Sequence, residues 1–103
     1  MALPTTDGVN YGQSVTKFPI ASETKDWGSV SDGDEAAEEV TVTGAQLGDF
    51  ALASMSIDTT DITLTATVTE ADKVTVILAN NTGGAIDLGS GTLYVMVIPR
   101  EVI

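Results

Sequence analysis

The stretch Ile62-Thr63-Leu64-Thr65-Ala66-Thr67-Val68-Thr69 decides the fold, because apolar residues and threonines alternate along it without an error. Successive side chains of an extended strand point to opposite faces of a sheet, so the apolar residues share one face and the threonines the other. The pattern predicts a β-strand with one buried and one solvated face, which is typical of antiparallel sheets.

Further strand signals lie on both sides of this stretch. Upstream, Val40-Thr41-Val42-Thr43 alternates, and residues 50–57 form a second candidate after a turn at Leu47-Gly48-Asp49. Downstream, residues 74–78 and 92–98 are strand-like, and the turn-rich run Asn80-Asn81-Thr82-Gly83-Gly84 separates them. Five or six short strands spaced by roughly 8–12 residues are typical of small all-β domains. The sequence predicts a small antiparallel β-sandwich or a jelly-roll-like barrel.

The last predicted strand is apolar on both of its faces. One alternating set is Leu93, Val95 and Val97, and the other is Tyr94, Met96 and Ile98. A strand with two apolar faces is typical of one that is covered on both sides. We therefore predict that the second set lies in the core or at an oligomer interface.

Residues 1–39 have a different composition from the rest of the chain. They contain two of the three prolines and show no sustained period of two or of 3.6 residues. We predict an extended, irregular N-terminal arm over residues 1–39 and a β-sandwich domain over residues 40–103. Tyr11, Phe18 and Trp27 are costly to leave in water, which indicates that they anchor the arm. They either line a ligand or glycan groove or, as we favour, pack onto the sandwich or onto a partner.

Composition excludes several classes of function. The chain has 103 residues, 15 acidic against four basic, and a formal net charge of −11. Such a field repels nucleic acids and anionic membrane surfaces, so we expect neither as a partner. Histidine and cysteine are absent, which removes the commonest general base, the commonest nucleophilic thiol and the commonest transition-metal ligands. We expect no enzyme activity and no cofactor.

Two groups of acidic residues are candidates for a metal-binding or catalytic site. Asp32-Gly33-Asp34-Glu35 suggests a Ca²⁺ loop, but the fifth and twelfth positions of an EF-hand would fall on Ala36 and Thr43, which do not ligate as that loop requires. A divalent site of another kind stays an open alternative there. Asp58 and Asp61 flank a short segment and could form a catalytic pair of carboxylates, but aspartate is also the residue that a turn between strands selects, which is the interpretation we favour. We assign no catalytic, metal or cofactor residue.

Size indicates that the domain does not stand alone. The strand region, residues 40–98, has about 60 residues, and a domain of that size is marginally stable without disulfides or metals. We expect a homotrimer or attachment to a larger assembly. Residues 1–7 lack the basic and apolar regions of a secretory signal, and no apolar run is long enough to span a membrane. We therefore expect synthesis in a cytoplasm.

Four stretches together resemble a small β-module of tailed-bacteriophage virion proteins, and above all of head-decoration (cement) proteins. They are the run from Val40 through Gly44-Ala45 to Gly48-Asp49, the run of residues 63–68, Asp72-Lys73-Val74-Thr75-Val76, and residues 80–93 with their Asn-Asn-Thr-Gly-Gly turn. The resemblance covers about residues 40–98 and contains no catalytic signature. Gly48-Asp49 and the turn at residues 80–84 are implied to be structural turns.

The resemblance implies a role on the outer capsid surface of a virion. Proteins of this kind sit on the head as trimers and clamp neighbouring major capsid subunits, often with an extended terminal arm. The implied partner is the major capsid protein. The alternative is a tail-fibre or head-spike module that recognises a glycan or protein on the host surface.

Overall fold

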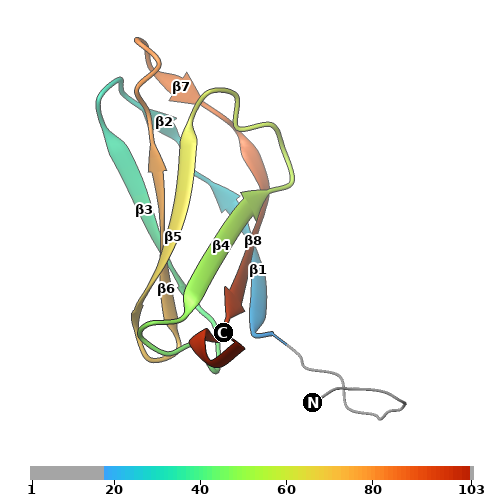
Figure 1. The fold of residues 1–103 in the computed structure, drawn as a ribbon. Coiled ribbons are helices and arrows are strands. Elements are labelled where there is room, and N and C mark those ends of the chain that lie inside the picture. Colours follow the sequence, from blue (N-terminus) through green and yellow to red (C-terminus); the bar gives the residue numbers. More distant parts are fainter. Residues whose placement is uncertain (1–17, 103) are drawn as a thin grey trace.

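The computed structural model describes residues 18–102, which form eight β-strands and one 3₁₀ turn (Figure 1). In chain order they are β1 (Ile20–Asp26), β2 (Ser29–Val30), β3 (Glu35–Thr41), β4 (Phe50–Met55), β5 (Thr63–Glu70), β6 (Lys73–Ala79), β7 (Ile86–Asp87), β8 (Ser90–Ile98) and η1 (Arg100–Val102). The all-β antiparallel sandwich expected from the sequence is confirmed. Within these residues no helix has the length and apolar character needed to cross a bilayer.

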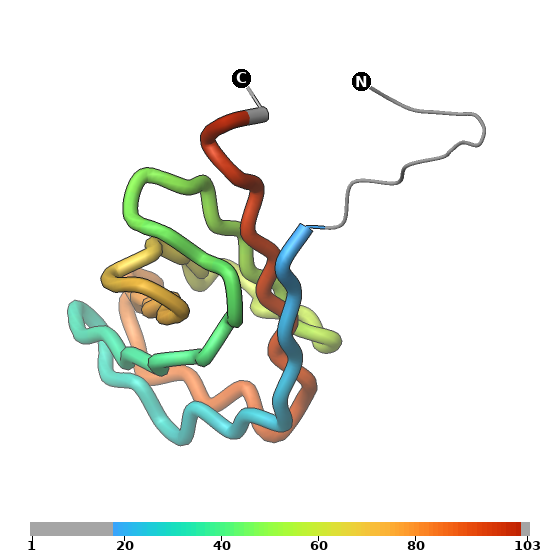
Figure 2. The backbone as a smooth tube through the Cα atoms, turned by 90° about the horizontal axis from the view of Figure 1, so that it is seen from below, coloured from blue at the N-terminus to red at the C-terminus, as the bar shows by residue number. Residues whose placement is uncertain are grey.

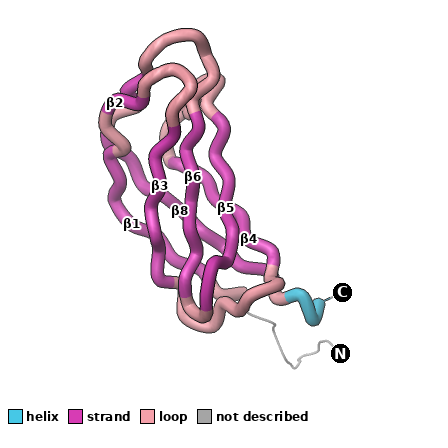
Figure 3. The backbone as a smooth tube through the Cα atoms, turned by 90° about the vertical axis from the view of Figure 1, so that its left-hand side faces the viewer, coloured by secondary structure: helices cyan, strands magenta, loops and turns pink. Residues whose placement is uncertain are grey.

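Two three-stranded antiparallel sheets make up the sandwich. One has the order β1-β8-β4 and the other the order β3-β6-β5, while β2 and β7 pair as a small ribbon at one end. Figure 3 shows the β3-β6-β5 sheet lying over the β1-β8-β4 sheet. Viewed from below in Figure 2, the first strand and the last strand run side by side. The first and the last strand of the described chain are therefore neighbours in the β1-β8-β4 sheet.

The core lies between the two sheets and is built by the alternation visible in the sequence. From the β3-β6-β5 sheet, Val68, Val74, Val76 and Leu78 point inward, and Leu93, Val95 and Val97 of β8 meet them from the other sheet. The threonines of β5 point outward, as the pattern of residues 62–69 predicts. This alternation also explains why one sheet-to-sheet core suffices to hold eight short strands.

The predicted boundary at residue 39 is wrong for the residues that the structure describes. Residues 20–39 contain β1, β2 and most of β3, so they belong to the sandwich and not to an irregular arm. β1 pairs with β8 over seven residues and β3 pairs with β6 over seven. Their apolar signal is weak because the inward side chains include Glu23, Lys25 and Glu38. Of the predicted arm, residues 1–17 lie outside the described residues.

Asn80 holds the loop between β6 and β7 from inside the domain. It is fully buried, and its Nδ2 donates to the carbonyl oxygens of Val30 and Gly84, each at 2.8 Å. Its Oδ1 accepts hydrogen bonds from the backbone N–H and the hydroxyl of Thr82 at 3.0 and 2.8 Å. Because every polar atom of the amide is paired, its burial is tolerated. The turn implied for residues 80–84 is thus built around one buried side chain.

Candidate docking surface

The side chains that point away from the core on the β1-β8-β4 sheet form the surface that we call the outer face. Alternation and register place twelve residues on it: Ile20, Ser22, Thr24 and Asp26 of β1, Ser90, Thr92, Tyr94, Met96 and Ile98 of β8, and Phe50, Leu52 and Ser54 of β4. Asp26, at one end, is the single charged residue in this set. A face so free of charge is unusual in a chain of net charge −11.

The apolar residues of the outer face gather at one of its ends. Pairing places Phe50 opposite Ile98, and the next row holds Ile20, Met96 and Leu52 side by side. Ile20 is 73 % exposed, Leu52 53 %, and Phe50 and Tyr94 48 % each. Isolated exposed apolar side chains are ordinary, but a contiguous patch of this kind marks an interaction surface.

A shallow hollow lies within this patch. It has a volume of about 390 Å³ and is lined by Leu52, Ala53, Ser54, Tyr94 and Met96. Tyr94 and Ser54 are partners across the β4-β8 pair, and Met96 and Leu52 form the next pair of that face. The hollow therefore lies over two neighbouring strands, whose hydrogen bonds fix the backbone beneath it.

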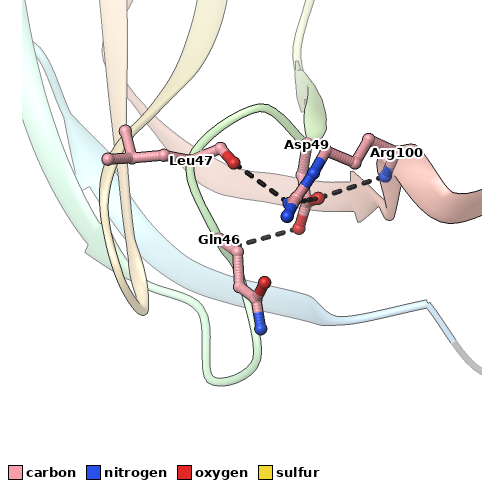
Figure 4. Close-up of polar contacts among 4 residues, drawn as sticks. All are labelled: Gln46, Leu47, Asp49 and Arg100. Carbon is pink, nitrogen blue, oxygen red and sulfur yellow. Dashed lines mark hydrogen bonds and ion pairs between the residues drawn. The ribbon is translucent and has the colours of Figure 1, made fainter.

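Asp49 and Arg100 fix the apolar end of the face by joining the start of β4 to the end of β8 (Figure 4). Oδ1 of Asp49 accepts hydrogen bonds from the backbone N–H of Arg100 at 3.1 Å and from its Nη1 at 3.2 Å, and Oδ2 accepts one from the N–H of Gln46 at 3.0 Å. Nη1 also donates to the carbonyl of Leu47 at 3.0 Å. These donors, the N–H of Arg100 foremost, hold the pKa of Asp49 below its usual range.

The outer face of the opposite sheet is polar. Its three strands present Thr63, Thr65 and Thr67 of β5, the charged pair Glu39 and Lys73, and Glu35. Ile77 is half-buried there and has Ala37 and Thr65 as its partners in the two neighbouring strands. The two sheets thus have opposite characters on their outward sides, and only the β1-β8-β4 sheet offers a large apolar area.

The structure places Tyr94, Met96 and Ile98 together on this outer face. The expectation that β8 is covered on both sides is wrong within the described chain, because Tyr94 is about half exposed while Leu93, Val95 and Val97 are buried. A three-stranded sheet has one core side, and the described residues provide no third layer over the other. The expected interface role of these three residues stays a prediction.

The predicted arm anchors have separate fates. Trp27 is 8 % exposed and packs into the core of its own chain, which is the second of the two roles considered for it. The Nζ of Lys25 lies 5.0 Å from the centre of its ring, a cation–π distance. Phe18 is half-buried at the start of the described residues. Tyr11 lies outside the described residues. Trp27 therefore has no surface to offer a partner.

Three residues of the apolar patch were missed by sequence reasoning: Ile20, Phe50 and Leu52. Phe50-Ala51-Leu52-Ala53 carries apolar residues on both alternating sets, the same signal that singled out β8, and could have indicated Phe50 and Leu52. Ile20 has no such local signal, because its place beside Met96 depends on pairing between the two ends of the chain.

The acidic groups tested as sites are arranged as turns and strand residues. Along β3, Glu38 points toward the core side while Glu35 and Glu39 point outward, so these carboxylates do not converge. Asp58 accepts a hydrogen bond from the N–H of Thr60 at 2.8 Å, which is the turn expected there. Among residues 18–102 no group of three or more acidic, histidine or cysteine side chains is placed to hold a metal ion.

Fold and surface together define a small antiparallel β-sandwich with one polar and one apolar outer sheet face. Comparisons with protein-family models, with curated proteins and with solved structures gave no match. What the protein does is therefore argued from its own residues.

Proposed function

We propose that this protein is a non-catalytic structural module of a bacteriophage virion, a decoration protein that binds the outer surface of the head and clamps neighbouring major capsid subunits. The resemblance of residues 40–98 to head-decoration proteins supplies the biological setting. The observation that carries the proposal is the outer face of the β1-β8-β4 sheet, which is almost uncharged and has an exposed apolar patch at one end, on an otherwise acidic chain.

Physical reasoning connects this face to the role. A shell is stabilised when an added protein binds its assembled form and not its separate subunits, because binding shifts the equilibrium toward the bound state. Each copy needs only a modest contact if many copies bind one lattice. The acidic remainder of the surface keeps unbound copies soluble and apart. Tyr94, Met96 and Ile98 are the contact residues in this proposal, together with Leu52.

Localisation on virions tests the proposal. Antibodies raised against the purified full chain should label the heads of the phage that encodes it, evenly over the capsid surface. Labelling of tail fibres alone would instead favour the host-recognition alternative, for which the hollow beside Tyr94 would be the ligand site. Virions that carry no label on any part would overturn the proposal of a virion protein altogether.

A further inference from the structure

The charges around the outer face define what kind of partner fits it. Residues 18–102 contain three basic side chains, and each is already paired with a carboxylate: Lys25 with Glu38, Lys73 with Glu39, and Arg100 with Asp49. No described cation is therefore free to meet a carboxylate of a partner.

Five exposed carboxylates lie at the two ends of the β1-β8-β4 sheet, four of them at the end away from the apolar patch and one at the end of the patch. Asp26 ends β1, Asp87 ends β7 shortly before β8, Asp58 and Asp61 lie on the loop that follows β4, and Glu101 follows β8. None of these five is paired with a cation within residues 18–102. The apolar patch thus has negative charge at its own end, on Glu101, and at the far end of the sheet, which complements a partner that carries lysine and arginine on both sides of its apolar contact.

A second copy of this chain fits the face less well. Two copies face to face would bring together two chains of net charge −11, and like charges across an interface are unfavourable. The exposed parts of Ile20, Phe50, Leu52 and Tyr94 amount to roughly 400 Å². A stable protein interface needs roughly 800 Å² from each partner, so the patch alone is small for any isolated pair and suits a contact that is repeated over a lattice.

The hollow gives the contact a centre. Leu52, Tyr94 and Met96 line the hollow, and this lining is apolar apart from the hydroxyls of Tyr94 and Ser54. The hollow lies over the hydrogen-bonded strands β4 and β8. Binding energy at protein interfaces concentrates where one aromatic or aliphatic side chain fills such a hollow and is desolvated. The matching partner therefore presents a protruding apolar side chain.

We infer that the outer face of the β1-β8-β4 sheet docks onto a protein surface on which a protruding apolar side chain, seated between Leu52, Tyr94 and Met96, is flanked on both sides by lysine and arginine. The inference deepens the proposed function, on which the choice of a protein assembly as partner rests. It adds the chemistry of the partner and the place of the contact.

Model peptides test this chemistry without any virion. The probe is a capped pentapeptide with one tryptophan between two pairs of lysines, titrated into the isotope-labelled full chain and followed by NMR. Chemical shifts should change at Leu52, Tyr94 and Met96, and the apparent affinity should fall severalfold from about 50 to about 300 mM NaCl. A peptide with serine in place of tryptophan, and one with glutamates in place of lysines, should each bind about tenfold more weakly or worse.

Variants of the full chain separate the face from the rest of the surface. Leu52→Ser and Tyr94→Ser should lower the affinity for the lysine–tryptophan peptide about tenfold. Ile77→Ser is the matched control, since Ile77 is the outward apolar residue on the opposite sheet, and it should leave the affinity within about twofold. The same variants in co-sedimentation with phage heads should lose or keep attachment in the same order.

Several results would overturn the inference. The first is equal binding of the three peptides, and the second is chemical-shift changes centred elsewhere than the outer face. The third is tight self-association in sedimentation that Leu52→Ser abolishes, which would make a second copy the occupant.

A spin label tests whether the chain's own N-terminal residues occupy the face. Because the chain has no cysteine, a label on Ser14→Cys is attached at a single position. Broadening of the Leu52 methyl signals by it, independent of protein concentration, would make the chain's own N-terminal residues the occupant. Peptide binding at the face without any label on virions would instead refute only the proposed function.

Discussion

The Nζ of Lys25 lies 2.9 Å from Oε1 of Glu38, and this ion pair bridges the two sheets at the side where β1 faces β3. Glu23, two residues before Lys25 on the same inward-facing set, lies close enough to Glu38 for each carboxyl group to affect the pKa of the other. Lys25 is therefore paired with one of two neighbouring carboxylates at the margin of the core.

The first prediction concerns the pH dependence of this cluster. The hydrogen bond with Glu38, burial and the charge of Glu38 raise the pKa of Glu23 above its ordinary 4.5. A raised pKa in the folded state means that Glu23 stabilises the fold below pH 4.5, and that this contribution is lost as the pH rises through the folded value. Glu23→Gln keeps a hydrogen-bonding group without the charge, so at pH 7 it should raise the free energy of unfolding by roughly 0.5 kcal/mol.

Urea unfolding followed by the fluorescence of Trp27, the sole tryptophan, measures this effect at pH 7 and near pH 4. The gain should shrink at the lower pH, where Glu23 is protonated in the parent chain as well. The pKa of Glu38 is lowered by its interactions with Glu23 and Lys25. Its contribution to stability therefore has the opposite pH dependence: it is present above pH 4.5 and is lost as the pH falls through the folded value. Glu35→Gln, on the outward side of β3, is the control. A Glu23→Gln variant that is less stable than the parent at pH 7 would contradict the prediction.

The second prediction concerns Asn80. Replacing it with alanine leaves the carbonyl of Val30 and the N–H of Thr82 without their side-chain partner in a buried setting. The free energy of unfolding should fall by about 2 kcal/mol. Asn81, the exposed neighbour, is the matched control, and Asn81→Ala should change stability by less than about 0.5 kcal/mol. Equal effects of the two substitutions in chemical denaturation would show that the buried network is not what holds the loop.

Local alternation predicted the strands whose inward residues are apolar. β5, β6 and β8 were located from the sequence because Leu64, Val76 and Leu93 and their neighbours repeat with a period of two. β1 and all of β3 before Val40 were missed, because a period of two can be recognised only where apolar and polar residues alternate. Their core-side residues include charges that become acceptable in the folded protein, where Lys25 pairs with Glu38. No property of the isolated segments reveals that pairing.

The candidate docking surface shows the same division. Tyr94, Met96 and Ile98 were found because they are neighbours along one strand. The rest of the patch depends on the pairing register of the sheet. Ile20 of β1 and Leu52 of β4 flank Met96 of β8, and these three strands are far apart in the sequence. Sequence alone also assigned Trp27 to an arm, and the burial of that side chain follows from β1, which carries the chain up to it.

The third prediction concerns Gly48. Its φ is +95°, and a Cβ at this position would lie 3.0 Å from Cδ of Arg100. Gly83 has nearly the same φ, +96°, but a Cβ there would meet nothing within 4 Å. Gly83→Ala should therefore cost about 1 kcal/mol for the left-handed backbone alone. Gly48→Ala should cost more, because Cδ of Arg100 must shift by a few tenths of an ångström while its Nη1 is bonded to Asp49 and Leu47.

A double variant isolates the contact with Arg100. In an Arg100→Ala background the crowding partner is gone, so Gly48→Ala should cost no more than Gly83→Ala does. Thermal unfolding of five proteins gives the comparison: the parent, the three single variants Gly48→Ala, Arg100→Ala and Gly83→Ala, and the double variant. If Gly48→Ala costs the same with and without Arg100, the close approach has no energetic consequence.

The fourth prediction concerns where the chain can be shortened. Removal of residues 1–30 takes away all of β1, together with Trp27 and Val30 of the core, and exposes one edge of β8. Unpaired edges and lost core residues are each strongly destabilising, so this variant should lack the far-ultraviolet circular dichroism of the folded sandwich at 25 °C. Removal of residues 1–17 leaves every strand and the whole described core in place, and should keep the cooperative unfolding transition.

These two truncations also decide what the N-terminal residues contribute to attachment. If residues 1–17 clamp a neighbouring subunit, the shorter truncation should remain folded and lose binding to phage heads. If the outer face alone carries attachment, the same truncation should bind as the full chain does, while Leu52→Ser in the full chain does not. A folded protein after removal of residues 1–30 would contradict the assignment of β1 to the sandwich, because the seven-residue pairing from Ile20 to Asp26 would then be dispensable.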